Sequence, residues 1–310
     1  MSISVVIPTL DRVQRLRHVL PTYLSQPETR EIIVVVDGSR DGTLTYLADL
    51  VRTQPRILYI DNAVNRGIPY SKNAGAAIAT SDYLFFGEDD LEITDGFFSI
   101  LLAHLQASGA DVIAGRTVWR DLGEPAEKAL ARADREPGPV VDTKTITLHQ
   151  NVRLDNDTRQ LLLSNSMLTK RELCKRYPFD ERYISNGWRE ESDFQLTLQE
   201  HGFKLFACPH AICYNLITDE RSGAHKTSGM RRVSRNLSNN WIFLRKHKEF
   251  IAEHFRSGNR FVCTIRLAVL LLKKDIVVPH LERMKQALLA HINRPRVSTE
   301  SRDCIDDGRR

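Results

Sequence analysis

The fold of this chain is decided by the stretch SDYLFFGEDDLE, residues 81–92. Its apolar run, Tyr83 to Phe86, has the length of a buried strand. The run is followed by three consecutive carboxylates, Glu88, Asp89 and Asp90, which repel one another unless a cation neutralises them. Hard oxygen ligands at the carboxyl end of a strand suit Mg²⁺ or Mn²⁺. A solvated acidic turn is the alternative, but the position directly after a buried strand favours a metal site.

Strands and helices alternate on the N-terminal side of this stretch. Apolar runs predict strands over Ile3–Ile7, Glu31–Val36 and Arg56–Asp61, and helical spacing predicts helices over Val13–Leu24, Leu44–Val51 and Tyr70–Ala79. Fully apolar strands alternating with helices imply an α/β fold with a parallel sheet covered on both faces. Ligands bind outside the carboxyl ends of such strands. We therefore expect Asp37 to lie on the same edge as Asp89 and Asp90.

The C-terminal side of the chain is less regular. We expect helices over 96–107, 170–176 and 189–201, strands over 110–116 and within 203–214, and a weaker strand region over 140–148. Residues 121–139 are rich in charge, Pro and Gly, which predicts a loop or mobile insertion. From Met230 the pattern is helical and basic, with further helices over 260–272 and 281–292. We expect a domain over 1–228, a basic helical extension over 229–293 and a disordered tail over 294–310.

Composition narrows the function classes. The chain has 310 residues and a net charge of +5, with Lys and Arg concentrated after Arg221. A basic face suits nucleic acid, anionic lipid or phosphorylated substrates, but no nucleic-acid module pattern is present, so we expect no nucleic-acid partner. Five cysteines without a CxxC motif favour reduced, cytosolic thiols over disulfides or a zinc site. No signal peptide or membrane-spanning run is evident, which predicts a cytoplasmic protein.

Several motifs occur in a characteristic order: residues 5–9 (VVIPT), 35–43 (VVDGSRDGT), 65–67 (NRG), 73–75 (NAG), 88–90 (EDD), 165–167 (NSM), 179–181 (FDE) and 188–194 (WREESDF). In this order and spacing they resemble family 2 glycosyltransferases of the GT-A fold, over roughly Ile3 to Tyr214. The resemblance implies a mostly parallel, Rossmann-like sheet flanked by helices. It also implies a nucleotide-sugar half over about 1–116 and an acceptor half over about 117–228.

The resemblance assigns a set of residues to the nucleotide-diphosphate donor. Asp37 matches the aspartate that contacts the nucleotide base, although Val36 stands where the family usually has another acid. The donor would be bound by Pro8, Thr9, Asp11, Asp37, Asn65, Gly67, Lys72, Asn73 and Asp89, with the segment from Asn65 to Asn73 at the diphosphate. From the residues alone, Asp37 could instead cap its own turn, and Lys72 could be an exposed helix lysine.

The metal and the general base are also implied by the resemblance. Asp90 would be the direct ligand of Mg²⁺ or Mn²⁺, Asp89 would contact the ribose or a metal-bound water, and Glu88 and His225 are further candidate ligands. Glu191 matches the general base, in place of the Asp that is usual there, and Asp193 is the substitute. The helix dipole alone would explain a carboxylate at this position. Trp188 would stack on an acceptor sugar or lie in the core.

These assignments imply an inverting, metal-dependent glycosyltransferase that moves one sugar from a nucleotide-diphosphate donor to a hydroxyl of a glycan, lipid-linked or small-molecule acceptor. The basic C-terminal helices suggest peripheral contact with the inner face of a membrane. One alternative is a nucleotidyltransferase, although residues 8–12 lack the glycine-rich signature expected after the first strand. The other is a non-catalytic nucleotide-sugar binding protein, which the departures at Glu88 and Glu191 would support.

Overall fold

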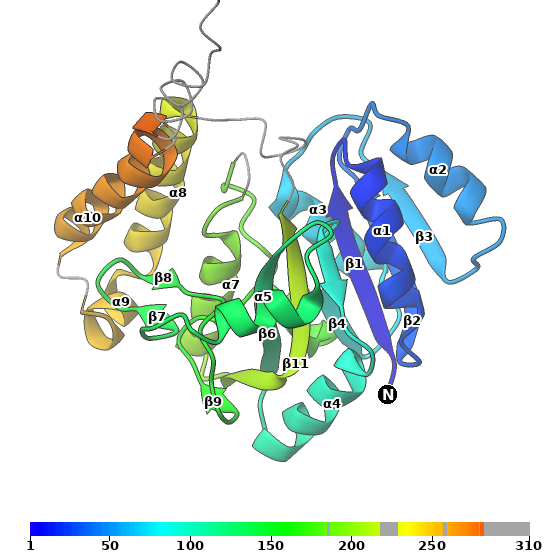
Figure 1. The fold of residues 1–310 in the computed structure, drawn as a ribbon, viewed down its shortest axis with the longest axis horizontal. Helices are drawn as coiled ribbons and strands as arrows, with labels where there is room; N and C mark the ends of the chain where they lie inside the picture. The colour runs from blue at the N-terminus through cyan, green and yellow to red at the C-terminus, as the bar shows by residue number, and fades with distance from the viewer. Residues whose placement is uncertain (185–186, 218–228, 257–258, 279, 282–310) are drawn as a thin grey trace, which may run out of the picture.

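A mixed sheet forms the centre of the molecule. The computed structural model describes residues 1–184, 187–217, 229–256, 259–278 and 280–281. Within these residues a nine-stranded sheet has the order β3-β2-β1-β4-β10-β6-β11-β5, with β9 beside β11 (Figure 1). Its strands are β1 (Ile3–Thr9), β2 (Thr29–Val36), β3 (Ile57–Asp61), β4 (Tyr83–Phe86), β5 (Leu91–Ile93), β6 (Val112–Asp121), β9 (Thr158–Arg159), β10 (Met167–Lys170) and β11 (Leu205–Ile217).

The N-terminal half of the sheet is parallel, as predicted. Strand β1 pairs in parallel with β2 and β4, and β2 pairs in parallel with β3. Strand β6 pairs in parallel with β11, whereas β10 runs antiparallel between β4 and β6. The parallel strands are apolar on both faces because helices cover both sides of the sheet. Their carboxyl ends meet at one edge.

Each face of the sheet has its own helices. The helices of the main domain are α1 (Val13–Leu24), α2 (Thr43–Leu50), α3 (Ile68–Ile78), α4 (Phe97–Ser108), α5 (Ala126–Ala133), α6 (Arg171–Arg176) and α7 (Glu190–Glu200). One core contains Val5 and Ile7 of β1 together with buried residues of α1, α2, α4 and α5. The other contains Val6 together with buried residues of α3, α6 and α7. The alternation of β1 side chains between two cores explains why its sequence is continuously apolar.

Three sequence predictions in this region were incomplete. The segment 121–139, predicted as a loop, contains helix α5, which buries Ala129 and Ala133. Two small residues give a weak apolar signal, so the surrounding charges concealed the helix. Strand β6 continues to Asp121, five residues beyond the predicted end, and the short strands β5 and β9 were not predicted. The region 140–148 forms a two-stranded hairpin of β7 (Val141–Asp142) and β8 (Thr147–Leu148).

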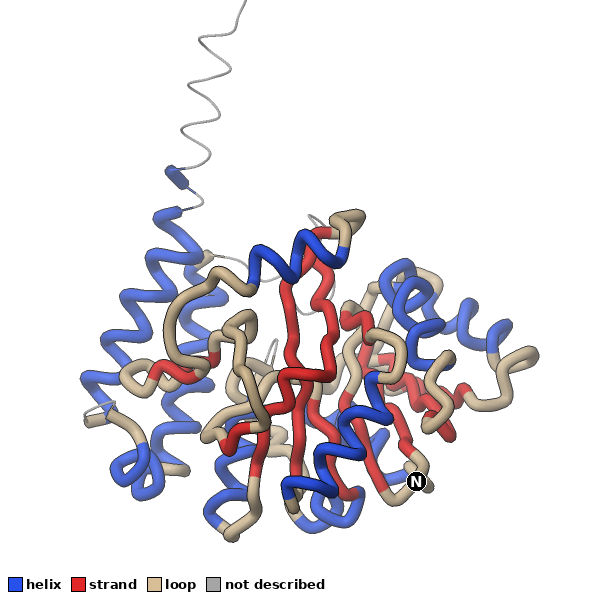
Figure 2. The backbone as a smooth tube through the Cα atoms, turned by 60° about the horizontal axis from the view of Figure 1, so that its bottom comes forward, coloured by secondary structure: helices blue, strands red, loops and turns tan. Residues whose placement is uncertain are grey.

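The C-terminal extension packs on the main domain. It comprises α8 (Met230–Lys246), α9 (Lys248–His254), α10 (Arg260–Leu272) and a π-helical turn over Lys273–Val277. Phe243 and Leu244 of α8 share a buried cluster with Leu196 of α7. In Figures 1 and 2 the extension lies at the end of the molecule remote from β3. No helix in the described part of the chain is long and apolar enough to cross a bilayer. The predicted helix over 281–292 and the tail over 294–310 fall almost wholly outside the described residues.

Candidate active site

The loops that follow β1 and β2 are fixed to each other at the carboxyl edge of the sheet. The backbone N–H of Asp11 donates to Ser39 Oγ at 3.0 Å, and the N–H of Arg40 donates to Asp11 Oδ1 at 2.7 Å. Asp41 Oδ2 accepts from the N–H of Val13 at 2.8 Å, at the first turn of α1. Asp11 adopts a φ of 52°, a left-handed conformation that Asp tolerates better than most residues. These reciprocal bonds hold both loops in one arrangement.

Asp37 organises a third loop at the same edge. Its carboxylate accepts from the N–H groups of Arg66 at 2.8 Å and Gly67 at 2.9 Å, and from Asn62 Nδ2 at 3.0 Å. Asp37 is buried, and its partners lie in the 62–67 loop rather than in its own turn. Asn65 is exposed. Its backbone nitrogen lies close to Gly38, and a Cβ atom added to Gly38 would approach this nitrogen to 2.7 Å. The contact of Asp37 with a nucleotide base stays a prediction.

The predicted metal cluster is held by two arginines that sequence reasoning missed. Arg12 Nη1 lies 2.7 Å from Asp89 Oδ1 and 2.9 Å from Asp90 Oδ2, and Arg15 Nη1 lies 3.1 Å from Asp90 Oδ2. Thr9 Oγ1 donates to Asp89 Oδ2 at 2.8 Å. The i, i+3 spacing of the two arginines at the start of α1 was the available signal, because it places both on one face of the helix.

Glu88 is the third carboxylate of this cluster. Its Oε2 accepts from the side-chain amides of Asn165, two residues before β10, and of Asn215 in β11. Burial raises the pKa of Glu88 well above its ordinary range, and the negative charges of Asp90 and Glu191 raise it further. Glu191 begins α7, and its charge is among those that act on Glu88, which indicates that the start of α7 lies near this cluster.

Lys72 lies between the two acidic residues that begin α7. Its Nζ is 2.7 Å from Glu190 Oε1 and 2.7 Å from Glu191 Oε1. The alternative interpretation of Lys72 as an exposed helix lysine is wrong, since its side chain is 3% exposed. Burial lowers the pKa of Lys72, but the two carboxylates together raise it above its ordinary value. An ammonium committed to two carboxylates is not placed as the phosphate contact that the resemblance implied.

The two glutamates differ in accessibility. The side chain of Glu190 is 6% exposed and that of Glu191 is 26% exposed. Burial raises the pKa of Glu190 to about 8, and Lys72 offsets this only in part because its charge is shared with Glu191. Among the described residues Glu190 Oε2 has no hydrogen-bond partner. Glu191 is therefore the carboxylate of this pair that an acceptor can reach.

Asp193 does not fit the role of substitute base. Its Oδ1 lies 2.9 Å from both the Tyr183 hydroxyl and His247 Nε2, and its Oδ2 lies 2.7 Å from Lys246 Nζ. The residue is 1% exposed. Positions two apart on a helix point about 160° away from each other, so Asp193 cannot take the place of Glu191. It anchors α8 of the extension to α7.

The remaining predicted residues that the structure describes make contacts within the fold. Asn73 Nδ2 donates to the Phe179 carbonyl at 2.9 Å, and its Oδ1 accepts from the Phe179 N–H at 2.9 Å, so it ties residue 179 to α3. Pro8 lies within β1 opposite Val35. Trp188 packs against a buried cluster of the extension, as the core interpretation predicted. His225 lies outside the described residues.

The charges of the site suit a divalent cation. Within the described residues five carboxylates face three basic side chains: Glu88, Asp89, Asp90, Glu190 and Glu191 against Arg12, Arg15 and Lys72. When all the carboxylates are ionised, two negative charges are in excess. Burial is the main cause that raises the pKa values of Glu88, Asp89 and Glu190. Without a metal, these carboxylates therefore tend to bind protons. An all-oxygen donor set with this excess charge fits Mg²⁺ or Mn²⁺.

A mostly parallel sheet whose carboxyl edge joins a carboxylate cluster to acidic residues at a helix start defines a glycosyltransferase of the GT-A fold. The chain belongs to glycosyl transferase family 2, whose model matches residues 4–167, more than half of the sequence. Both alternatives, the nucleotidyltransferase and the non-catalytic binding protein, are therefore wrong as the class of this protein.

Relatives and solved structures agree with this assignment. The chain is 31% identical over 121 residues to the GalNAc(5)-diNAcBac-PP-undecaprenol beta-1,3-glucosyltransferase of Campylobacter jejuni. The aligned region covers 38% of this chain and 39% of that protein. A mannosyltransferase from Pyrobaculum calidifontis, solved with GDP-Man and Mn²⁺, has a TM-score of 0.58 at 15% identity over 94% of this chain and 81% of that one. S. aureus TarS, residues 1–349, solved with UDP-GlcNAc, has a TM-score of 0.59 at 14% identity over 80% of this chain and 67% of that one.

The sequence matches to curated relatives are partial. They span between 16% and 39% of the length of those proteins. The structural matches, at these low identities, establish the fold alone.

Proposed function

We propose that this protein is an inverting, metal-dependent glycosyltransferase that moves one sugar from a nucleotide-diphosphate donor to an acceptor hydroxyl. The observation that carries the proposal is the joining of two groups at one sheet edge. Asp89 and Asp90 follow β4, while Glu191 begins α7, and the negative charges of both groups raise the pKa of Glu88. One group suits a cation bound to diphosphate, and the other suits a general base.

The donor end would be formed by the residues that follow β1, β2 and β4. Glu88, Asp89 and Asp90 would hold Mg²⁺ or Mn²⁺, which when bound would neutralise the charge that develops on the leaving diphosphate. Arg12 and Arg15 fix Asp89 and Asp90 from one side, so these carboxylates are oriented before a ligand arrives. The nucleotide would lie against the fixed loops that contain Pro8, Thr9 and Asp11, and against the 62–67 loop that Asp37 holds.

The acceptor end would be served by Glu191. Its carboxylate would remove the proton from the acceptor hydroxyl as that oxygen attacks the anomeric carbon from the face opposite the leaving group. Such an attack inverts the configuration at that carbon. Lys72 keeps Glu191 in place by its 2.7 Å contact. Glu190 lies deeper and contributes to the position of Lys72 rather than to proton transfer.

The acceptor that we propose is lipid-linked, because the extension presents an apolar surface next to basic residues. On α10, Phe261, Ile265 and Val269 are 59%, 64% and 61% exposed. Arg260 and Lys273 lie at the two ends of this helix. An exposed apolar helix face with flanking basic residues suits the surface of an anionic bilayer. The name of the Campylobacter jejuni relative includes an undecaprenol-linked glycan, which supports the same class of acceptor.

The proposal is tested by donor binding and by membrane binding. In a screen of nucleotide sugars by thermal unfolding, one donor should stabilise the protein only with Mn²⁺ or Mg²⁺ present, by about 2.7 kcal/mol at 100 times its dissociation constant. Equal stabilisation by that donor with and without metal would contradict metal dependence. Vesicles containing anionic lipid should bind the protein, and a charge at Ile265 and at Val269 (Ile265→Glu, Val269→Glu) should abolish sedimentation with them. Unchanged sedimentation of that double variant would count against the membrane contact.

A further inference from the structure

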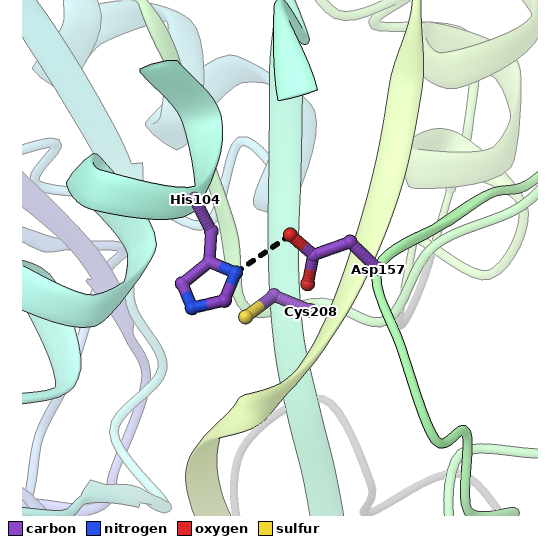
Figure 3. Close-up of side chains that lie close together, drawn as sticks. All are labelled: His104, Asp157 and Cys208. Atoms are coloured by element: carbon purple, nitrogen blue, oxygen red, sulfur yellow. Dashed lines mark hydrogen bonds and ion pairs between the residues drawn. The ribbon is translucent and has the colours of Figure 1, made fainter. Parts of the chain in front are cut away.

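Three side chains with metal-binding atoms meet near the start of strand β11, far along that strand from the candidate active site. His104 comes from α4, Asp157 precedes β9, and Cys208 lies in β11. Their ligand atoms all lie within 4.8 Å of one another, and His104 Nδ1 is 2.6 Å from Asp157 Oδ2. Figure 3 shows the three side chains converging from their three elements.

This cluster is distinct from the carboxylates of the candidate active site. Cys208 lies in the first part of β11, whereas Leu216, near the other end of that strand, donates its N–H to the Asp90 carbonyl at 2.8 Å. With a rise of about 3.3 Å per residue, the strand separates the two groups by roughly 20 Å or more. The cluster therefore cannot supply ligands to the cation that we propose at Asp90.

The local backbone explains why these residues meet. Strand β9 pairs antiparallel with β11, with Ala207 opposite Thr158, which brings Asp157 beside Cys208. The pairing of β11 with β6 shifts register between Cys208 and Ile212, a β-bulge that re-aims the side chains between them. One of these is His210, an exposed residue whose ring centroid lies 5.0 Å from that of His104.

We propose that His104, Asp157 and Cys208 bind a Zn²⁺ ion, with His210 or water in the fourth position. Imidazole nitrogen, carboxylate oxygen and thiolate sulfur are the three ligand types that Zn²⁺ takes in proteins. Tetrahedral Zn²⁺ with bonds of about 2.0–2.3 Å places ligand atoms about 3.3–3.8 Å apart. The present separations need changes of about 1 Å, which rotations of partly exposed side chains can provide, since those of His104 and Asp157 are 32% and 19% exposed.

Two further features favour a metal over a simple ion pair. Asp157 Oδ1 is buried and makes no regular hydrogen bond among the described residues, although the Cys208 thiol lies close enough to interact with this carboxylate. Cys208 is 1% exposed, so its thiol is enclosed beside this carboxylate and the His104 ring. A metal ion would replace the thiol proton and complete the coordination of both groups.

The bound ion would link the predicted acceptor half, through Asp157 and Cys208, to α4 in the predicted nucleotide-sugar half. It would tie the segment before β9 to α4 and to β11, three elements that are far apart in the sequence. The cysteine spacing predicted no zinc site because no CxxC motif is present, but a site assembled from three separate elements leaves no such spacing. Structural Zn²⁺ sites contribute directly to the free energy of folding, so loss of the ion should lower thermal stability.

The test uses Co²⁺ as a spectroscopic substitute for Zn²⁺ in the full-length protein. A Cys304→Ser background removes a thiol that lies outside the described residues. After chelator treatment, about one equivalent of Co²⁺ should produce a thiolate-to-cobalt charge-transfer band, and added Zn²⁺ should abolish it. Cys208→Ser should lack the band, whereas Cys174→Ser, a matched control with another buried thiol, should keep it. A missing band, or a band that persists in Cys208→Ser, would overturn the proposal.

Two more variants test whether the loss of the band reflects a folding defect or the cation proposed at Asp90. His104→Gln changes a partly exposed helix residue and should lower the affinity for Zn²⁺ by more than about tenfold, as judged by competition with a chromophoric chelator. Circular dichroism confirms that the variants are folded, and unchanged affinity in folded His104→Gln would also refute the site. Asp90→Asn should keep the thiolate band, because its ligand set contains only oxygen.

Discussion

Lys72 Nζ lies 2.7 Å from Glu191 Oε1, and the same ammonium lies 2.7 Å from Glu190 Oε1. Lys72 comes from α3, and the glutamates come from the start of α7, more than a hundred residues later. One positive charge therefore holds the proposed base against the donor half of the domain. It cannot neutralise both carboxylates, so one of them must stay charged or bind a proton.

Glu191→Gln should lower kcat by ~10² to 10⁴-fold, because glutamine keeps the shape of the side chain but cannot accept a proton. Donor affinity should hardly change, since the base faces the acceptor. Steady-state transfer assays with saturating donor measure the effect. Glu190→Gln is the matched control on the same helix turn and should lose much less activity. Similar losses in both variants would assign the base function to the pair rather than to Glu191.

Lys72→Met should destabilise the fold by about 3–5 kcal/mol, because it leaves the buried Glu190 and the partly exposed Glu191 without their cation. Urea unfolding followed by fluorescence provides the measurement. The double variant Lys72→Met/Glu190→Gln should recover part of the loss, since one buried charge is then removed together with its partner. A double variant less stable than Lys72→Met would show that the unpaired carboxylate of Glu190 is not the cause.

The buried carboxyl of Glu190 should make stability depend on pH. Burial raises its folded pKa to about 8, above the value of an unfolded glutamate. Between those two values the folded chain binds a proton that the unfolded chain has lost, so stability falls as pH rises towards 8. The slope contributed by this group is on the order of 1 kcal/mol per pH unit. Chemical unfolding at pH 6 and pH 8 should show this decrease, and Glu190→Gln should reduce it; equal decreases in the two proteins would contradict the assignment.

Asp90→Asn should abolish the metal-dependent part of donor binding while the protein stays folded. The amide keeps one oxygen but loses the charge that a hard cation requires. Calorimetric titration with donor in Mn²⁺ and in chelator gives the metal-dependent fraction. Asp82→Asn, an exposed residue before the same strand, is the control and should behave as the wild type. Unchanged Mn²⁺-dependent affinity in Asp90→Asn would remove Asp90 from the metal site.

Asp193→Asn should weaken the attachment of the extension without a large effect on kcat. The change leaves His247 and Lys246 without their shared anion, which should cost about 3 kcal/mol of stability. Limited proteolysis should show earlier cleavage in α8. The contrast with Glu191→Gln is the informative comparison, because the two residues are neighbours in sequence with different partners. A kcat loss as large as that of Glu191→Gln would restore Asp193 as a candidate base.

The fold was largely predictable because its strands are buried on both faces. Strand β4 has the predicted bounds, and so does α1, since each combines an apolar pattern with a clear stop. Strands β5 and β9 are only three and two residues long, and pairing with β11 decides them rather than their own composition. Helix α5 was hidden for a related reason, because its buried face is made of alanines.

The candidate site was predictable only where its residues are adjacent in sequence. Glu88, Asp89 and Asp90 form one local motif, and Glu191 lies in another. The partners of these residues come from other elements: Arg12 from the end of the β1 loop and Lys72 from α3. A sequence gives no direct signal for such pairs, because the contact depends on how the sheet orders its strands and not on spacing along the chain.

The reciprocal bonds between the loops after β1 and β2 have a consequence for how this enzyme can diversify. Asp11 and Asp41 already restrain both loops, so little backbone freedom remains to be lost when a nucleotide binds. Substitutions in the acceptor half leave these bonds untouched. If the proposed donor site is correct, mutation of residues 117–228 could explore new acceptors while the affinity for the donor is inherited unchanged.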